Sequence, residues 1–153
     1  MKTLCVLQVE DTEEDVVLLR YAFQQAGIQS VLRAVPHGEA AMDYILGKGD
    51  FYDREAFPLP ALILLDLKLP GMSGLELLGW VRSSSPIRMV PVIVLSSSSH
   101  RTDVESAYER CANAFVTKPS GIDELTELVE GLKIFWLKHT QFPAGSVNTA
   151  IRR

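Results

Sequence analysis

The sequence has little cysteine, no cluster of positive charge and no long hydrophobic run. Its two cysteines, Cys5 and Cys111, are far apart, which argues against a small secreted fold held together by disulfides. The formal net charge is −4 with no lysine or arginine block, which argues against electrostatic binding of nucleic acid or a membrane surface. No apolar run approaches the roughly 20 residues of a membrane span, and the first residues lack a signal-peptide pattern. We therefore expect a cytoplasmic protein whose partners include neither nucleic acid nor membrane.

Short apolar runs alternate with segments of helical periodicity along the chain. The runs are almost uniformly apolar, as expected of strands that are covered on both faces. They occupy residues 4–9, 31–35, 61–66, 91–96 and 114–117. Strands that alternate with helices predict an α/β protein with a parallel sheet and helices on both faces.

The alternation extends to about residue 139 of the 153 residues. It predicts one domain at 1–139 and a short tail at 140–153, with no output domain. One connection, at residues 47–60, is long and contains several aromatic residues. We expect this connection to be a surface loop or a contact element.

Polar residues stand where four of the predicted strands end. They are Glu10 and Asp11, Asp66, Ser96 and Ser97, and Lys118 followed by Pro119. Each alone has an ordinary explanation, such as helix capping or a solvated loop. In an open parallel sheet, however, the carboxyl ends of the strands form the binding site, so these side chains should lie together.

Three neighbouring carboxylates repel one another unless a cation joins them. Mg²⁺ prefers one or two carboxylates together with water and phosphate oxygens, so the set predicts phosphate chemistry. The carboxylate of Asp66 could serve as the nucleophile, while Lys118 and Ser96 could neutralise the charge on the phosphate oxygens.

These residues, with the turn at 67–74, resemble the receiver domain of two-component response regulators over about residues 3–138. The resemblance implies a doubly wound, flavodoxin-like (βα)₅ fold with strand order 2-1-3-4-5. It also implies that Asp66 accepts a phosphoryl group from a sensor histidine kinase. Asp11 would bind Mg²⁺ or Mn²⁺ directly, Glu10 would bind it through water, and the backbone carbonyl of Lys68 would complete the site.

The resemblance assigns roles to the remaining strand-end residues as well. Ser96 corresponds to the switch residue, and Ser97 to the small neighbour that leaves room for the phosphoryl group. Lys118 would pair with the phosphoryl oxygens, and the bond before Pro119 would be cis. Phe115 occupies the position of a rotating aromatic residue.

Two variable positions in this family tune the lifetime of the phosphoryl group, and here they are Lys68 and Ser98. We hypothesise that the Lys68 side chain leans over the phosphoryl group and hinders the attacking water.

A narrower similarity links the chain to the single-domain regulators partnered with bacterial phytochromes. The markers are the long connection at 47–60, the serine-rich segment after residue 95 and the late aromatic pair Phe135 and Trp136. This similarity implies a light-regulated kinase, an unknown downstream protein, and a possible homodimer through helix 4, strand 5 and helix 5. Because Phe135 and Trp136 are adjacent, they should point to different sides of the last helix, with one of them at the surface.

Three other functions compete with a phosphorylated regulator. A dehalogenase-like phosphatase would need an aspartate at position 68, where this chain has lysine. A DNA-binding regulator would need far more than the 15 or so residues that follow the last helix. A pseudo-receiver or phosphate-sink module stays open as the alternative, although every acceptor and metal position is filled. We expect no turnover enzyme that acts on a separate substrate.

Overall fold

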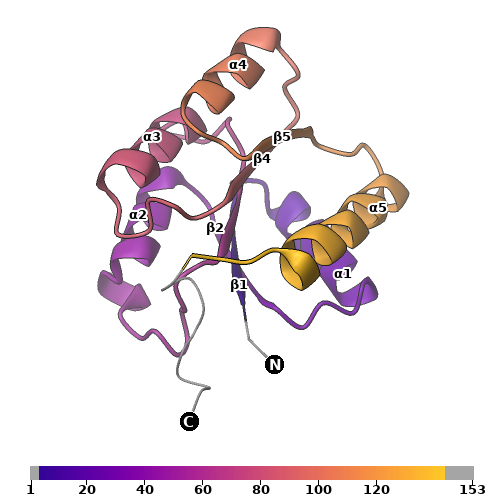
Figure 1. Ribbon diagram of the computed structural model, residues 1–153, viewed down its shortest axis with the longest axis horizontal. Helices are drawn as coiled ribbons and strands as arrows, with labels where there is room; N and C mark the ends of the chain where they lie inside the picture. Colours follow the sequence, from indigo (N-terminus) through magenta and orange to yellow (C-terminus); the bar gives the residue numbers. More distant parts are fainter. Residues whose placement is uncertain (1–3, 144–153) are drawn as a thin grey trace.

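The computed structural model describes residues 4–143 as a five-stranded parallel sheet flanked by helices (Figure 1). The strands are β1 (Cys5–Val9), β2 (Val31–Val35), β3 (Leu62–Leu65), β4 (Val92–Ser96) and β5 (Ala114–Thr117). Their order in the sheet is β2-β1-β3-β4-β5. The predicted fold class and strand order are therefore confirmed.

Helices cover both faces of the sheet, and each follows the strand of the same number. They are α1 (Glu13–Gln25), α2 (Gly38–Leu46), α3 (Gly74–Ser84), α4 (Arg101–Glu109) and α5 (Ile122–Leu132). Figure 1 shows α1 and α5 on one face, with α2, α3 and α4 on the other. None of the helices within residues 4–143 is long and apolar enough to span a bilayer.

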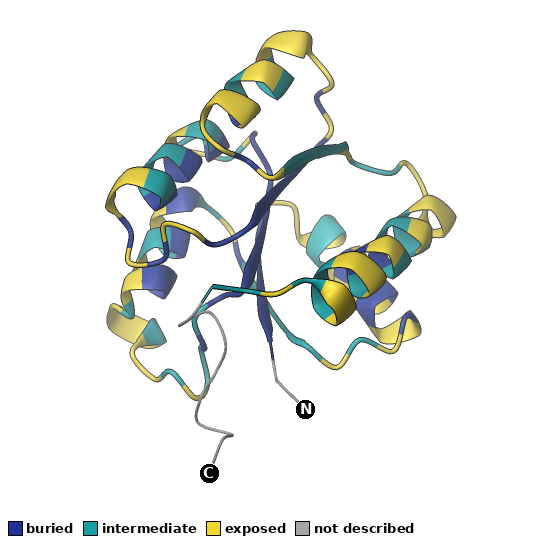
Figure 2. Cartoon of the chain, viewed as in Figure 1, coloured by how far each residue is buried: buried dark blue, intermediate teal, exposed yellow. Residues whose placement is uncertain are grey.

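Two hydrophobic cores form because successive side chains of a strand point to opposite faces. In β1, Cys5, Leu7 and Val9 join the core beneath α2, α3 and α4, whereas Val6 joins the core beneath α1 and α5. Figure 2 shows the central strands buried and the outward sides of the helices exposed. This double cover explains why the strands are apolar along their whole length.

The long connection between α2 and β3 is held against α2 by aromatic packing and hydrogen bonds. It contains a short 3₁₀ helix, η1 (Gly49–Phe51), and packs Phe51 and Phe57 around the buried ring of Tyr44. Arg54 donates hydrogen bonds to the carbonyl oxygens of Tyr44 and Ile45 at the end of α2. The connection is therefore an ordered extension of α2.

The last helix changes its winding near its end. After α5 the backbone continues as a π-helical segment, η2 (Lys133–His139). Phe135 is 62% exposed, whereas Trp136 packs against the core beneath α1 and α5, as predicted for adjacent residues. The described residues end at 143, so most of the tail predicted at 140–153 lies outside them.

Candidate functional site

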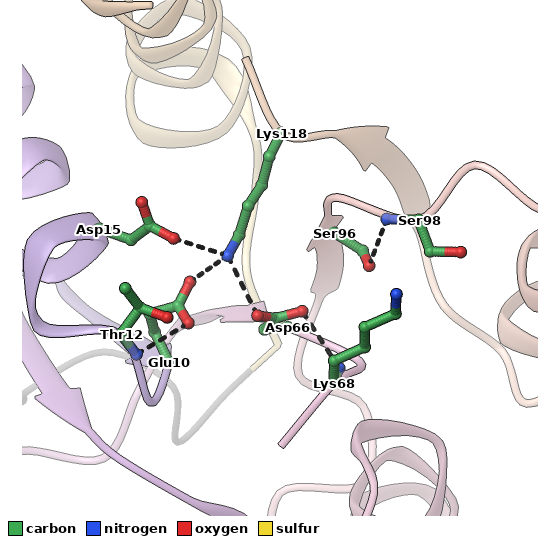
Figure 3. A network of polar contacts seen from close by, with 8 residues as sticks. All are labelled: Glu10, Thr12, Asp15, Asp66, Lys68, Ser96, Ser98 and Lys118. Carbon is green, nitrogen blue, oxygen red and sulfur yellow. Dashed lines mark hydrogen bonds and ion pairs between the residues drawn. The ribbon is translucent and has the colours of Figure 1, made fainter. Parts of the chain in front are cut away.

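Backbone hydrogen bonds between neighbouring strands align the polar residues at one edge of the sheet. The Asp66 N–H donates to the carbonyl oxygen of Val9 at 3.1 Å, and the Lys118 N–H donates to that of Ser96 at 2.8 Å. Figure 3 shows the side chains of Glu10, Asp66 and Lys118 converging there. The parallel register thus assembles the site that the strand ends predicted.

Three carboxylates at this edge form a cluster suited to a cation. One oxygen each of Glu10, Asp11 and Asp66 lies within 4.8 Å of the others. Glu10 is 4% exposed, and its burial, together with the nearby charge of Asp66, raises the pKa of this carboxyl to about 7 despite hydrogen bonds from Lys118 and the Thr12 N–H. Neighbouring carboxylate oxygens whose negative charges repel one another fit a hard divalent cation.

Lys118 supplies the positive charge of the site. Its ammonium group donates hydrogen bonds to Glu10, to Asp15 Oδ2 at 2.9 Å and to Asp66 Oδ2 at 3.1 Å (Figure 3). Burial would lower the pKa of Lys118, but these three carboxylates outweigh it and raise the pKa above its usual value. The ammonium therefore stays charged and points toward Asp66.

Asp15 is a site residue that the sequence analysis missed. It stands in the first turn of α1, where an acidic residue is usually explained by the helix dipole.

The peptide bond between Lys118 and Pro119 is trans, so the predicted cis bond is wrong. Trans is the more stable isomer of such bonds by about 0.5–1 kcal/mol. Lys118 already reaches all three carboxylates with this bond in the trans form, so the contacts do not require the less stable isomer.

Asp66 is also held by the turn that follows it. Its Oδ1 accepts a hydrogen bond of 3.2 Å from the Lys68 N–H. In Figure 3 the exposed side chain of Lys68 extends on the side of Asp66 that faces Ser96 and Ser98. The metal role of the Lys68 carbonyl stays a prediction.

The serine-rich segment after β4 joins the site to α4. Ser96 is buried, and its hydroxyl oxygen accepts a hydrogen bond of 3.2 Å from the Ser98 N–H. The hydroxyl of Ser98 donates in turn to Asp103 Oδ2 at 2.6 Å. Ser97 is exposed. The contact with Asp103, which the sequence analysis missed, ties the serine segment to the first turn of α4.

Phe115 lies apart from these polar contacts. Its ring is half-buried against the core beneath α2, α3 and α4, and its N–H donates to the Tyr108 hydroxyl at 3.1 Å. The structure thus places it in β5 as predicted, while its role as a rotating switch stays a prediction.

Gly74, at the start of α3, lies directly against the backbone of the turn that follows Asp66. A Cβ atom at this position would lie 2.3 Å from the Asp66 carbonyl oxygen and 2.7 Å from the Leu67 Cα. The Gly74 N–H donates to the Leu67 carbonyl oxygen at 3.0 Å. Only glycine allows the helix to approach the turn this closely.

Comparison with known proteins agrees with this geometry. The sequence profile of the response regulator receiver domain matches residues 6–130. The chain is 34% identical to response regulator Rcp1 of Synechocystis sp. (strain ATCC 27184 / PCC 6803 / Kazusa) over 91% of this chain and 92% of Rcp1. The structure of the Mn²⁺-bound form of Rcp1 superposes with a TM-score of 0.81 and 33% identity, covering 92% of this chain and 99% of that one.

Two further solved structures are similar over most of their length. The phosphorylated cyanobacterial phytochrome response regulator RcpA gives a TM-score of 0.84 at 30% identity, covering 93% of this chain and 99% of that one. The bacteriophytochrome response regulator RtBRR gives a TM-score of 0.72 at 40% identity, covering 94% of this chain and 86% of that one. With a matching profile, fold and strand-end site, this chain belongs to the response regulator receiver domain family of two-component signalling, whose members accept a phosphoryl group.

Proposed function

We propose that this chain is a response regulator that accepts a phosphoryl group from a sensor histidine kinase on Asp66 and requires Mg²⁺. The observation that carries the proposal is the position of the Asp66 carboxylate. It accepts a hydrogen bond of 3.1 Å from the Lys118 ammonium and clusters with the carboxylates of Glu10 and Asp11. We infer that the protein signals through protein contacts and does not turn over a separate substrate.

In the transfer step, a carboxylate oxygen of Asp66 forms a bond to the phosphorus of the kinase phosphohistidine. The bond from phosphorus to the imidazole nitrogen breaks, and that nitrogen keeps the electron pair. A divalent cation held by Glu10, Asp11 and Asp66 would neutralise charge on the phosphoryl oxygens. Lys118 is already directed at Asp66 and would pair with another of these oxygens, and the hydroxyl of Ser96 would donate to a further one.

Incubation with acetyl phosphate and Mg²⁺, followed by intact-mass measurement, tests the acceptor. We expect one phosphoryl adduct on the wild type and on Asp43→Asn, a matched control at an exposed position of α2. We expect no adduct on Asp66→Asn or in the presence of a chelator. Absence of an adduct on the wild type, with metal present, would favour a pseudo-receiver.

We propose a bacteriophytochrome as the sensor kinase, acting in the cytoplasm, where kinases find ATP. The similarity to phytochrome response regulators of two kinds, RcpA and RtBRR, supports this choice. Phosphotransfer from a panel of purified histidine kinases would test it. The phytochrome kinase should phosphorylate this chain fastest and in a light-dependent manner, and a preference for another kinase would refute the choice.

We also propose that a homodimer forms through α4, β5 and α5. Tyr108, Ile122 and Phe135 support this surface, because each leaves a large apolar side chain exposed on or next to these elements. Light scattering over a dilution series should show dimers for the wild type and for Tyr52→Ser, whose ring is exposed in the long connection. Phe135→Ser should shift the mass toward the monomer, and an unchanged mass would contradict this interface.

A further inference from the structure

Asp15 is the third carboxylate that contacts the Lys118 ammonium, and it approaches from α1. Its Oδ2 lies 2.9 Å from Lys118 Nζ. Unlike Glu10 and Asp66, Asp15 is not among the three carboxylates whose oxygens gather within 4.8 Å of one another. Its contact is therefore with the ammonium and not with the candidate cation position.

The ammonium group has three N–H donors, and each points to a different carboxylate. Two of these carboxylates, Glu10 and Asp66, also face the position where a divalent cation would bind. A cation that is coordinated by those oxygens would weaken the interactions of Glu10 and Asp66 with the Lys118 ammonium. Asp15 is then the partner that keeps the ammonium in place.

Lys118 borders a cavity on the α1 side of the site. A cavity of about 230 Å³ lies between α1 and the start of α5, and Lys118 and Asp15 both line it. Other parts of its wall come from Leu18, Leu95 and Ile122. The ammonium is held beside this space by its charge pairs with Glu10, Asp15 and Asp66.

We propose that Asp15 is a positioning residue for phosphoryl acceptance: it anchors Lys118 from the α1 side and thereby limits how strongly Lys118 competes for the carboxylates of the cation site. The proposal rests on the proposed function of the Asp66 site. Without Asp15, the ammonium pairs with Glu10 and Asp66 alone. The Lys118 ammonium then competes more strongly with the cation for these carboxylates. It is also less well positioned to pair with the oxygens of an incoming phosphoryl group.

Calorimetric titration with Mg²⁺ tests the first consequence without any phosphorylation. We expect Asp15→Asn to raise the Kd for Mg²⁺ about two- to fivefold, the effect of losing one partly exposed charge pair. Glu13→Gln is the matched control, because Glu13 is an exposed carboxylate in the same turn of α1 and the variant removes the same charge. Asp15→Glu should restore most of the affinity.

Repeating the Asp15 substitution in a variant that lacks the Lys118 ammonium separates positioning of Lys118 from a general effect of charge. In Lys118→Met, or Lys118→Gln if the former does not fold, the change at Asp15 should no longer alter the Kd. At saturating Mg²⁺, Asp15→Asn should also slow phosphorylation by acetyl phosphate about two- to fivefold.

The proposal is overturned if Asp15→Asn behaves like Glu13→Gln, or if its effect on the Kd persists without Lys118. If the wild type binds Mg²⁺ but accepts no phosphoryl group, the proposed function fails. The titrations still decide whether Asp15 anchors the ammonium.

Discussion

A single methyl group should have opposite effects at two glycine positions of α3, Gly74 at its start and Gly79 in its middle. At Gly74, a Cβ atom would lie 2.3 Å from the Asp66 carbonyl oxygen and 2.7 Å from the Leu67 Cα. Both are backbone atoms, so no side-chain rotation can relieve the contact. Overpacking of this kind costs about 1–3 kcal/mol, and the fixed backbone places Gly74→Ala at about 3 kcal/mol. This is a large part of the 5–15 kcal/mol that stabilises a typical domain.

At Gly79, in the same helix, nothing lies within 4 Å of the added Cβ atom. Gly79→Ala should therefore raise the free energy of unfolding by about 0.5–1 kcal/mol through helix propensity alone. Both variants replace glycine with alanine in the same helix, and their free energies of unfolding should differ by roughly 3–4 kcal/mol. Because the Gly74 clash falls on the carbonyl of Asp66 itself, Gly74→Ala should also slow phosphorylation, whereas Gly79→Ala should not.

Urea unfolding followed by far-UV circular dichroism measures both free energies. Phosphorylation by acetyl phosphate at a temperature where both variants are folded measures the second effect. Two variants that differ by less than about 1 kcal/mol would refute the claim that the turn after β3 has no room for a side chain at Gly74.

Three further substitutions probe other parts of the molecule. Lys68→Ala should speed loss of the phosphoryl group by about fivefold, equivalent to about 1 kcal/mol on the barrier, because water then approaches Asp66 more freely. Tyr44→Phe should lower the free energy of unfolding by about 1–3 kcal/mol, since its hydroxyl donates to the buried carbonyl of Pro58 at 2.8 Å. Gln8→Leu should raise it by about 1 kcal/mol, because the buried Gln8 Oε1 has no hydrogen-bond partner among the described residues.

Each of these expectations can fail in its own assay. An unchanged dephosphorylation rate for Lys68→Ala would remove the shielding hypothesis. Urea unfolding decides the other two: a Tyr44→Phe variant as stable as the wild type would mean that the Pro58 carbonyl finds another donor. A destabilised Gln8→Leu would mean that the amide of Gln8 has a partner, such as water, in the folded protein.

The sequence predicted the strand-end residues well because their neighbours are unambiguous. Asp66 follows four buried apolar residues, so its position at the end of β3 could hardly shift. Glu10 follows the buried strand β1 and Lys118 follows the shorter, half-buried strand β5, and parallel pairing places all such ends at one edge. The sequence therefore predicted the fold, and the site residues that the strands position directly.

The same reasoning could not predict the residues that helices bring to the site. Asp15 and Asp103 both lie in the first turn of a helix, where an acidic side chain usually needs no further explanation. Their contacts with Lys118 and Ser98 depend on how the helices pack, which strand register does not determine. The isomer of the bond before Pro119 was also misjudged, because the resemblance alone suggested it.

Both edge strands of the sheet make hydrogen bonds to other parts of their own chain. Arg33 of β2 donates two hydrogen bonds to the Ala56 carbonyl in the long connection, which lays that segment against the strand. In β5, the N–H of Phe115 is taken up by the Tyr108 hydroxyl. Free N–H and carbonyl groups on an edge strand invite pairing with another molecule. The Tyr108 hydroxyl occupies an edge N–H of β5, and the Arg33 contact holds the long connection beside β2. Both contacts disfavour growth of the sheet from copy to copy, so association between copies should use side-chain surfaces and not strand pairing.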